Sequence, residues 1–450
     1  MITSVITLGC PKNLVDSEII LGNLAQSGFL LTDSVDNAHL VIINTCAFIK
    51  PAVLEAKEKI REVLRKKRSG MIQKVFVVGC LVQRYKQELE KEFPEVDAFL
   101  GIDYLAKVCA IAKGLPKADK KTYVRTPRSL SLSLSAKSGH TLRVAEPRLV
   151  STPRHYAYLK IADGCDNRCS YCLLPSIRGR FRSREIEDII SEARMLAKSG
   201  VKELILVAQD TTFYGQDLYH RPMLVQLLKQ LNRIQSIIWI RLLYTHPAHF
   251  TDELIETIAE LPRVAKYIDL PLQHISDRLL AQMNRQVNRR NIEELIEKLR
   301  KIDGLTLRTS FIVGFPSETD KDFAELLDFI RQQEFDHLGC FTYYREKGSL
   351  AYSFRNQIPE KVKIERFNTL MKLQKSISQR RLFRLKGQRV RVLIDTFARR
   401  KGYNCVGRTE GNAPEIDGLV YIKGRGIEPG NFITAKVINS SDYDLYAVKV

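Results

Sequence analysis

Short apolar runs rich in β-branched residues alternate with amphipathic helical patterns through most of this sequence, and this alternation restricts the fold more than any other feature. In the first part of the chain, three such runs cover residues 4–10, 39–46 and 74–80, and each is followed by a helical pattern. A strand and helix rhythm of this kind is typical of parallel sheets covered by helices. We therefore predict an α/β protein whose amino-terminal domain is built on a parallel sheet.

A second series of strand-like runs occupies the middle of the chain. These runs also alternate with helical patterns, and a right-handed βα repeat curls into a barrel. Six units fall short of the eight that close such a barrel, so we expect a (βα)6 partial TIM-like barrel with an open side for a macromolecular substrate. The six runs are 156–163, 203–210, 237–246, 267–273, 305–315 and 338–344.

The end of the chain changes to short β-like runs separated by glycine, proline and acidic residues, which favours a small antiparallel barrel. These runs are 387–395, 418–424, 431–439 and 443–450. A stretch rich in serine, proline and basic residues separates the first two zones and reads as a linker. The 450 residues are enough for about three domains. The predicted bounds are 1–115 for the amino-terminal domain, 116–150 for the linker, 151–383 for the barrel and 384–450 for the last domain.

Composition and charge indicate the kind of partner, the cellular location and the cysteine chemistry to expect. The chain has 71 lysine and arginine residues against 51 acidic ones, a net charge of +20, which favours a polyanionic partner, although a basic solubility surface has the same composition. No window has the ~18 uninterrupted apolar residues of a membrane span, and the start lacks the basic region of a signal peptide. We therefore predict a cytoplasmic protein that does not enter a membrane. Nine cysteines in such a chain favour metal or redox chemistry over disulfides.

Three cysteines, Cys165, Cys169 and Cys172, follow the first barrel strand with the spacing C-x3-C-x2-C. Residues after a barrel strand lie at the active face of the fold. A closed zinc site would need a fourth cysteine or histidine nearby, and none follows. A cubane iron–sulfur cluster on three thiolates leaves one iron free for a small ligand, which we expect to be a substrate or cofactor. Zinc or a plain structural cluster is the alternative.

Three further cysteines, Cys10, Cys46 and Cys80, end the three apolar runs of the amino-terminal zone. Parallel strands bring their carboxyl ends to one edge of the sheet, so these thiols are expected to converge although they lie far apart in sequence. Three buried strand-end cysteines with no ligand are the alternative. The remaining cysteines are expected to be small buried apolar residues. They are Cys109, Cys340 and Cys405.

The C-x3-C-x2-C motif, with an aromatic residue before its last cysteine and a partial barrel around it, resembles the radical S-adenosylmethionine superfamily. Within it, the chain resembles the methylthiotransferases, whose amino-terminal domain carries a second cluster on three cysteines. "GCPKNLVDSE", "NTCAFI", "GCLVQRY", "SIRGRFRSR", "AQDTTFYGQD" and "DLPLQH" are similar to the branch that modifies a ribosomal protein. The transfer RNA branch usually has Gln-Met at Pro11-Lys12. Two residues depart from the family pattern, Ala47 and Ser317, where glycine is expected.

The resemblance implies an enzyme, a transferase that adds a methylthio group to the β-carbon of an aspartate in small-subunit ribosomal protein twelve. It implies two 4Fe-4S clusters, held by Cys165, Cys169 and Cys172 and by the amino-terminal trio, with S-adenosyl-L-methionine as cofactor. The first cluster would cleave the cofactor to a radical that removes hydrogen from the substrate, and the second would carry the sulfur. The alternatives are the same chemistry on transfer RNA adenosine, or a non-catalytic iron–sulfur RNA-binding protein.

Weaker cofactor-binding predictions fall on residues near the strand ends. Tyr171 resembles the residue whose backbone contacts the cofactor's adenine, and Gly314 would permit close approach of the backbone. Packing is the alternative for Tyr171, and Ser317 with Asp320 reads as a capping box for the next helix. The other residues end predicted strands, where turn formation or helix capping is the alternative. They are Gln209, Asp210, Gln273 and His274, the last without an assigned role.

The last zone resembles the TRAM domain, an RNA-binding appendage. The stretch 372–392 concentrates basic residues and fits phosphate contact, although a solvated helix has the same composition. The acidic stretch 413–418 is expected to meet the basic protein substrate. Expected partners are therefore ribosomal protein twelve, free or within the subunit, RNA through the TRAM domain, and an electron donor such as a flavodoxin.

Overall fold

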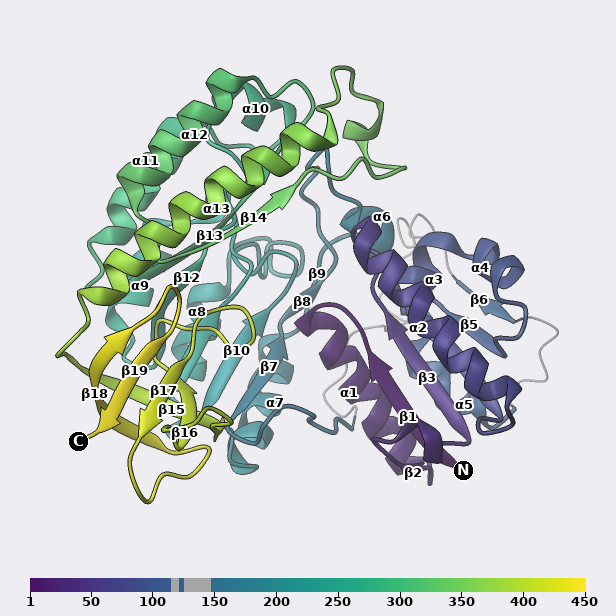
Figure 1. The fold of residues 1–450 in the computed structure, drawn as a ribbon. Helices are drawn as coiled ribbons and strands as arrows, with labels where there is room; N and C mark the ends of the chain where they lie inside the picture. The colour runs from purple at the N-terminus through teal and green to yellow at the C-terminus, as the bar shows by residue number, and fades with distance from the viewer. Residues whose placement is uncertain (115–120, 125–146) are drawn as a thin grey trace.

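The computed structural model describes residues 1–114, 121–124 and 147–450 of the chain. Figure 1 shows an amino-terminal sheet covered by helices, a larger central sheet with helices, and a small β-barrel at the carboxyl end. Most of the linker predicted over 116–150 lies outside the described residues. No helix among the described residues is long and apolar enough to cross a membrane.

The amino-terminal sheet has six strands in the order β2-β1-β3-β4-β5-β6, and every pair of neighbours is parallel, which confirms the predicted parallel α/β domain. All six residues of β3 are buried, because helices cover both faces of the sheet. The strands are β1 (Ile2–Thr7), β2 (Leu30–Leu31), β3 (Leu40–Thr45), β4 (Lys74–Gly79), β5 (Ala98–Leu100) and β6 (Thr122–Tyr123).

The helices of this domain follow the strands as the sequence pattern indicates. Helix α2 buries Val53, Ala56, Ile60 and Val63, which recur at helical spacing and form one apolar stripe. The helices are α1 (Pro11–Gln26), η1 (Val35–Asn37), α2 (Lys50–Arg68), α3 (Cys80–Tyr85), α4 (Gln87–Glu92), η2 (Ile102–Lys107) and α5 (Val108–Ala112).

The central domain contains a six-stranded parallel sheet in the order β14-β13-β12-β11-β10-β7, an open partial barrel as predicted. Its strands are β7 (Tyr156–Lys160), β10 (Glu203–Val207), β11 (Trp239–Leu242), β12 (Val264–Asp269), β13 (Thr306–Val313) and β14 (His337–Thr342), with β8 (Ala162–Asp163) and β9 (Arg182–Ser183) forming a separate pair. Its helices are α6 (Leu174–Arg178), α7 (Ile186–Lys198), α8 (Leu224–Leu231), η4 (Pro247–His249), α9 (Asp252–Glu260), α10 (Asp277–Gln282), α11 (Arg289–Arg300), α12 (Asp320–Gln333), η5 (Leu350–Ser353) and α13 (Glu360–Phe383).

Two local predictions in this domain are wrong. Strands β10, β11 and β12 end three or four residues before the apolar runs end, because the last residues of each run form the loops at the active face. The capping box of α12 is made by Thr319 and Asp322, not by Ser317 and Asp320. Ser317 instead has a φ of 68°, a conformation that glycine adopts most easily, which accounts for the glycine expected there.

The carboxyl-terminal domain is a closed barrel in the order β15-β16-β17-β19-β18. The prediction of four strands in a purely antiparallel barrel needs two corrections, since β16 was missed and β17 pairs with β19 in parallel. Strand β16 has only four residues, too few for a clear alternation. The strands are β15 (Arg389–Phe397), β16 (Cys405–Arg408), β17 (Val420–Lys423), β18 (Phe432–Ser440) and β19 (Leu445–Lys449).

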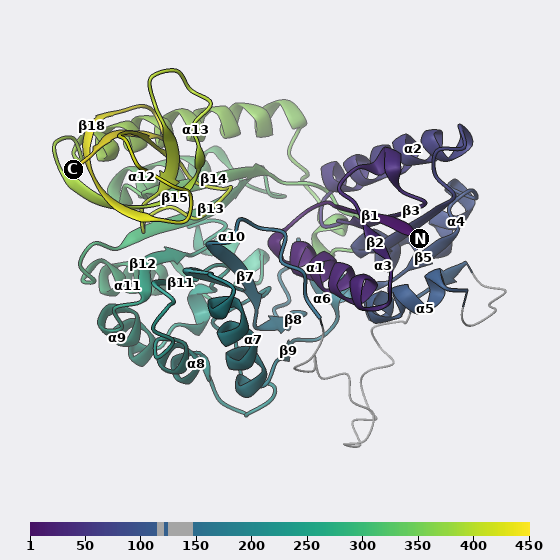
Figure 2. The ribbon, with the colours of Figure 1, turned by 90° about the horizontal axis from the view of Figure 1, so that it is seen from below.

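The loop between β16 and β17 reaches into the central barrel. Ala413 belongs to the same apolar cluster as Tyr158 and Tyr267 of the barrel strands. Arg308 donates a hydrogen bond of 2.9 Å to Asp417, and the Asp417 side chain has no exposed surface. The expectation that this acidic stretch meets a basic partner is therefore wrong for Asp417, whose charge is used inside the protein. Figure 2 shows the carboxyl-terminal barrel beside β13 and β14, and the amino-terminal domain on the other side.

Candidate functional site

The three amino-terminal cysteines lie at one edge of the sheet. Cys10 directly precedes α1, Cys46 follows β3, and Cys80 begins α3, and their strands β1, β3 and β4 are neighbours. Gly9 has a φ of 97°, and a Cβ atom there would lie 2.5 Å from the Cβ of Cys46, so only glycine permits this approach. The structure thus places the three cysteines at the carboxyl ends of neighbouring parallel strands, near enough for Cys10 and Cys46 to act on Cys80.

These thiols are in a setting that suits a cationic ligand. Burial raises the pKa of the Cys80 thiol to about 12, and the nearby Arg178 guanidinium acts in the opposite direction. Burial also raises the pKa of Cys46. A bound metal centre deprotonates such thiols outright, so three soft donors at one edge fit an iron–sulfur cluster.

The second group of cysteines lies in the loop between β8 and α6, after the first barrel strand. Cys165 is buried, and the backbone N–H groups around this loop are ordered by hydrogen bonds such as that from Cys165 N to Gly179 O, 3.1 Å. The Leu174 N–H donates to Cys172 Sγ at 3.4 Å, and Arg285 Nη1 donates to Cys169 Sγ at 3.6 Å. Burial raises the pKa of the Cys172 thiol, and the hydrogen bond from Leu174 acts in the opposite direction. This donor set also fits a three-thiolate cluster.

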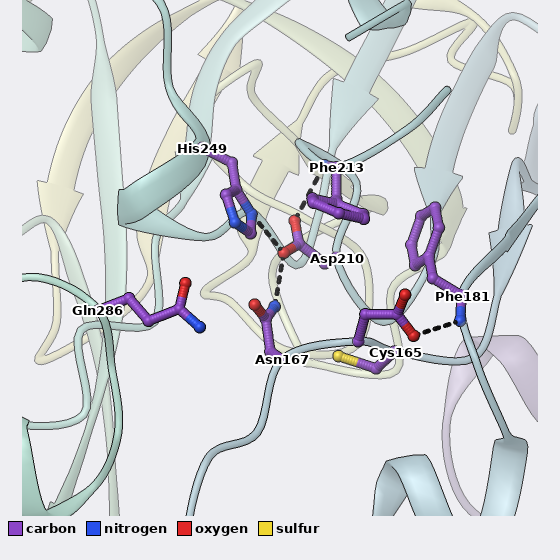
Figure 3. Close-up of a pocket in the computed structure, with 8 residues that line it drawn as sticks. Cys165, Asn167, Phe181, Asp210, Phe213, His249 and Gln286 are labelled. Carbon is purple, nitrogen blue, oxygen red and sulfur yellow. Dashed lines mark hydrogen bonds and ion pairs between the residues drawn. The ribbon is translucent and has the colours of Figure 1, made fainter. Parts of the chain in front are cut away.

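A cavity of about 150 Å³ opens beside Cys165 (Figure 3). It is lined by Cys165, Asp166, Asn167, Phe181, Asp210, Phe213, His249 and Gln286. The Asp210 carboxylate, which follows β10, accepts hydrogen bonds from Asn167 Nδ2 at 2.7 Å and Thr212 Oγ1 at 2.7 Å. It also lies 2.8 Å from His249 Nδ1. An acidic group is therefore held in the wall of the cavity, which Cys165, a candidate cluster ligand, also lines.

Two histidines of this site were not predicted, although both lie just after the third barrel strand. His249 lines the cavity, and His246 is stacked on it with ring centroids 4.9 Å apart. Burial lowers the pKa of His246 to about 2, so this imidazole is neutral. Ligand atoms of Asp210, His246 and His249 lie within 4.8 Å of one another. The signal available in the sequence was the position of "THPAH" at a strand end.

The other predicted cofactor residues have different surroundings. Gln209 donates to Asp163 at 3.0 Å, and Tyr171 packs against an apolar cluster around Phe315. Gln273 adopts a φ of 74° in the loop after β12, and its N–H donates to Ser310 O. The Gly314 N–H donates to Glu318 at 2.6 Å. Among the five predicted contacts, only Asp210 lines the cavity.

The surroundings of Gly314 and His274 are set by packing and by local hydrogen bonds. A Cβ at Gly314 would lie 2.3 Å from Cγ of Lys363, so packing against α13 already requires glycine there. His274 has no exposed surface, and its Nδ1 accepts from Ser276 N at 3.0 Å. No role for His274 follows from this burial, and its place near the strand end after β12 stays a prediction.

A buried ion network joins the two cysteine regions. Arg178, at the end of α6, donates to Asp16 of α1 at 2.9 Å and to Asp163 at 3.0 Å. Lys160 of β7 pairs with the same two carboxylates. Arg178 is also among the charges that act on Cys80 and Cys10. The network therefore fixes helix α1, and the cysteine before it, against the barrel.

Lys12 lies in the first turn of α1, two residues after Cys10. Its Nζ is 3.3 Å from the carbonyl oxygen of Ala208 and 3.3 Å from the centroid of the Tyr244 ring. Burial lowers the pKa of this ammonium, and the Cys10 thiol acts to raise it. In the sequence, Lys12 stands out only as part of the motif "GCPKNLVDSE".

Comparison with protein families agrees with this architecture. The model of the radical SAM superfamily matches residues 159–330, that of the uncharacterized protein family UPF0004 matches 3–101, and that of the TRAM domain matches 387–450. A solved structure of the radical S-adenosylmethionine methyltransferase TsrM from Kitasatospora setae has a similar fold, with a TM-score of 0.56 and 16% identity over 76% of this chain and 72% of that one. The fold and the cysteine site together define a radical S-adenosylmethionine enzyme.

Full-length relatives show to which family of radical S-adenosylmethionine enzymes the chain belongs. The ribosomal protein uS12 methylthiotransferase RimO of Pelotomaculum thermopropionicum is 44% identical over 98% of this chain and 97% of its own length. The protein of the same name from Acetivibrio thermocellus is 46% identical over 98% and 96%. The chain belongs to the ribosomal protein uS12 methylthiotransferase family and is a transferase.

Proposed function

We propose that this enzyme adds a methylthio group to the β-carbon of an aspartate in ribosomal protein uS12, which is protein twelve of the small ribosomal subunit. The observation that carries the proposal is the presence of two three-thiol sites in one chain, joined by the buried ion network of Arg178. Its full-length relatives bear the name of this activity. The alternatives, transfer RNA as substrate and a non-catalytic RNA-binding protein, are not favoured by these relatives.

In this proposal Cys165, Cys169 and Cys172 hold a 4Fe-4S cluster with S-adenosylmethionine beside it. When bound, this pair supplies a radical able to abstract hydrogen from an unactivated C–H bond, which no acid or base of the protein could ionise. Asp210 contributes a charged hydrogen-bond acceptor at the cavity. The other proposed contacts, Tyr171, Gln209, Gln273 and Gly314, orient the cofactor from the loops around this edge.

The amino-terminal trio, Cys10, Cys46 and Cys80, is proposed to hold a second 4Fe-4S cluster that carries the sulfur to be inserted. Arg178 places a guanidinium near Cys80 and Cys10, which offsets the negative charge of a thiolate cluster. Its hydrogen bonds to Asp16 and Asp163 hold the two regions in a fixed relation. This preorganisation suits a reaction that needs both sites at once.

The domain roles follow the same proposal. Residues 1–115 form the sulfur-carrying domain and 151–383 the radical domain, joined through 116–150, and 384–450 form a TRAM domain that contacts uS12 or ribosomal RNA. A one-electron donor such as a flavodoxin reduces the radical-forming cluster. We place the enzyme in the cytoplasm, where uS12 and the ribosomal subunit are available.

The test is an anaerobic assay with reconstituted enzyme, S-adenosylmethionine and reductant, in which uS12 and unmodified transfer RNA are offered in parallel. A methylthio mass gain on an aspartate of uS12 is expected. A gain on transfer RNA alone would contradict the proposed substrate, and 5′-deoxyadenosine formation without either product would contradict the proposed transfer.

A further inference from the structure

Lys12 differs from the other buried lysines of the described chain in lacking a carboxylate partner. Lysine is seldom buried without such a partner. Lys160 pairs with Asp16 and Asp163, and Lys363 pairs with Glu360 at 3.2 Å. Lys12 is only 7% exposed, yet it forms no ion pair with any residue that the structure describes. An ammonium removed from water without a counter-charge is costly, which indicates that an anion completes this site.

The contacts that Lys12 does make leave donors free. An ammonium has three N–H donors. One contact is the Ala208 carbonyl at 3.3 Å, and another is the face of the Tyr244 ring, 3.3 Å from Nζ to the centroid. Both partners are neutral, and an aromatic face stabilises a cation without replacing a counter-ion. The side chain is therefore held in place by the protein and still able to bind an acceptor.

The position of Lys12 places this unpaired charge between the two cysteine sites. It follows Cys10 by two residues in α1, so its backbone belongs to the amino-terminal site. Its Nζ contacts Ala208 at the end of β10, two residues before Asp210, which lines the cavity beside Cys165. Lys12 therefore connects the helix that follows Cys10 with the segment that leads from β10 to the cavity.

The charged groups that act on Lys12 do not contact its Nζ among the described residues: the Cys10 thiol makes no hydrogen bond to it, and the two nearby carboxylates are already engaged. Asp163 accepts from Arg178 at 3.0 Å and from Gln209 at 3.0 Å. Asp269 accepts from the Tyr244 N–H at 2.9 Å and lies 3.5 Å from Arg308. The free donors of Lys12 are thus left for a group that enters from outside the chain.

We propose that Lys12 binds the side-chain carboxylate of the substrate aspartate and thereby positions its β-carbon between the two sites; this rests on the proposed function. The β-carbon of aspartate is bonded directly to the carboxyl carbon, so an ammonium that fixes the carboxylate also fixes the C–H bond to be broken. Lys12 acts as a specificity-determining residue, because a neutral side chain or a nucleobase lacks the charge that it pairs with.

The experiment compares the binding of uS12 with that of uS12 carrying asparagine at the modified aspartate. Reconstituted enzyme with S-adenosylmethionine, kept without reductant so that no turnover occurs, is titrated with each protein. The enzyme variants are Lys12→Met, which keeps the length and removes the charge, Lys12→Arg, which keeps the charge, and the exposed control Lys91→Met. Iron content is measured for each.

For the unaltered enzyme and for Lys91→Met we expect the asparagine form to bind about 30-fold more weakly, the scale of a lost buried charge pair. For Lys12→Met the two forms should bind within about threefold of each other, with iron content maintained, and Lys12→Arg should restore part of the preference. A Lys12→Met enzyme that keeps the full preference would overturn the proposal. So would a variant that loses iron yet keeps the preference, since Lys12 would then serve the cluster.

Failure of this proposal is distinguishable from failure of the proposed function. If the unaltered enzyme methylthiolates uS12 but Lys12→Met still discriminates aspartate from asparagine, only the role of Lys12 is wrong. If the unaltered enzyme neither modifies uS12 nor prefers its aspartate form, the proposed function itself is wrong.

Discussion

At the scale of single residues, the two groups of thiols are expected to have separable roles. Replacement of Cys165 by alanine should abolish both S-adenosylmethionine cleavage and product, because the proposed radical-forming cluster would lose a ligand. Replacement of Cys46 by alanine should abolish the methylthio product while 5′-deoxyadenosine is still formed. The measurement is chromatography of 5′-deoxyadenosine together with mass spectrometry of uS12. The control is Cys405→Ala, since Cys405 lies in the core of the carboxyl-terminal barrel.

Normal product from Cys46→Ala would remove the amino-terminal trio from the reaction. Loss of all secondary structure in this variant, seen by circular dichroism, would instead mean that the thiol is structural.

The buried imidazole of His274 predicts a pH dependence of stability. Burial lowers the pKa of His274 to about 3, below the ordinary value of about 6.5. As the pH falls below about 6.5, the unfolded chain binds a proton that the folded chain does not, so stability is lost on acidification by about 1.4 kcal/mol per pH unit. Urea unfolding between pH 6.5 and 5 should show a shallower loss for His274→Gln, and no change for the exposed His220→Gln. Equal slopes for all three proteins would contradict this account.

At the scale of elements, helix α1 is attached to the barrel by the Arg178 network. Replacement of Arg178 by methionine leaves Asp16 and Asp163 without their guanidinium partner, and breaking a buried pair in this way costs about 3–5 kcal/mol. We expect a lower Tm and loss of iron from the amino-terminal site. Arg180→Met, which removes an exposed pair with Asp166, should change the Tm little. Unchanged Tm and iron content in Arg178→Met would show that the network does not hold α1.

The elements also show how far the sequence predicts the structure. The two parallel sheets follow from their apolar runs, since buried strands and helical stripes have strong periods. The strand ends at β10 to β12 and the short β16 were misjudged, because apolar loop residues resemble strand residues and four residues carry little period. His246 and His249 were missed because a lone histidine after a strand forms no recognisable sequence pattern. The lack of a carboxylate partner at Lys12 depends on contacts between distant segments, which only the folded chain brings together.

At the scale of the whole molecule, the carboxyl-terminal barrel is held to the central one by buried charges. Arg408 of β16 forms ion pairs with Asp395 at 2.8 Å and with Glu203 of β10 at 2.8 Å, and all three side chains are largely buried. Arg408→Met should therefore lower the Tm and expose the junction near residue 384 to limited proteolysis, because Glu203 keeps only Arg241 as a partner. The exposed Arg425→Met is the matched control. An unchanged cleavage pattern would mean that other contacts hold the two barrels together.

We interpret the whole molecule as an enzyme in which two cysteine sites act on a single aspartate of uS12. The most direct test is mass spectrometry of uS12 after anaerobic turnover by the reconstituted enzyme with S-adenosylmethionine and reductant. The account predicts a methylthio group on one aspartate, located by fragmentation to its β-carbon, and none with Cys46→Ala. Unmodified uS12 from an enzyme that holds both clusters and cleaves S-adenosylmethionine would contradict the account.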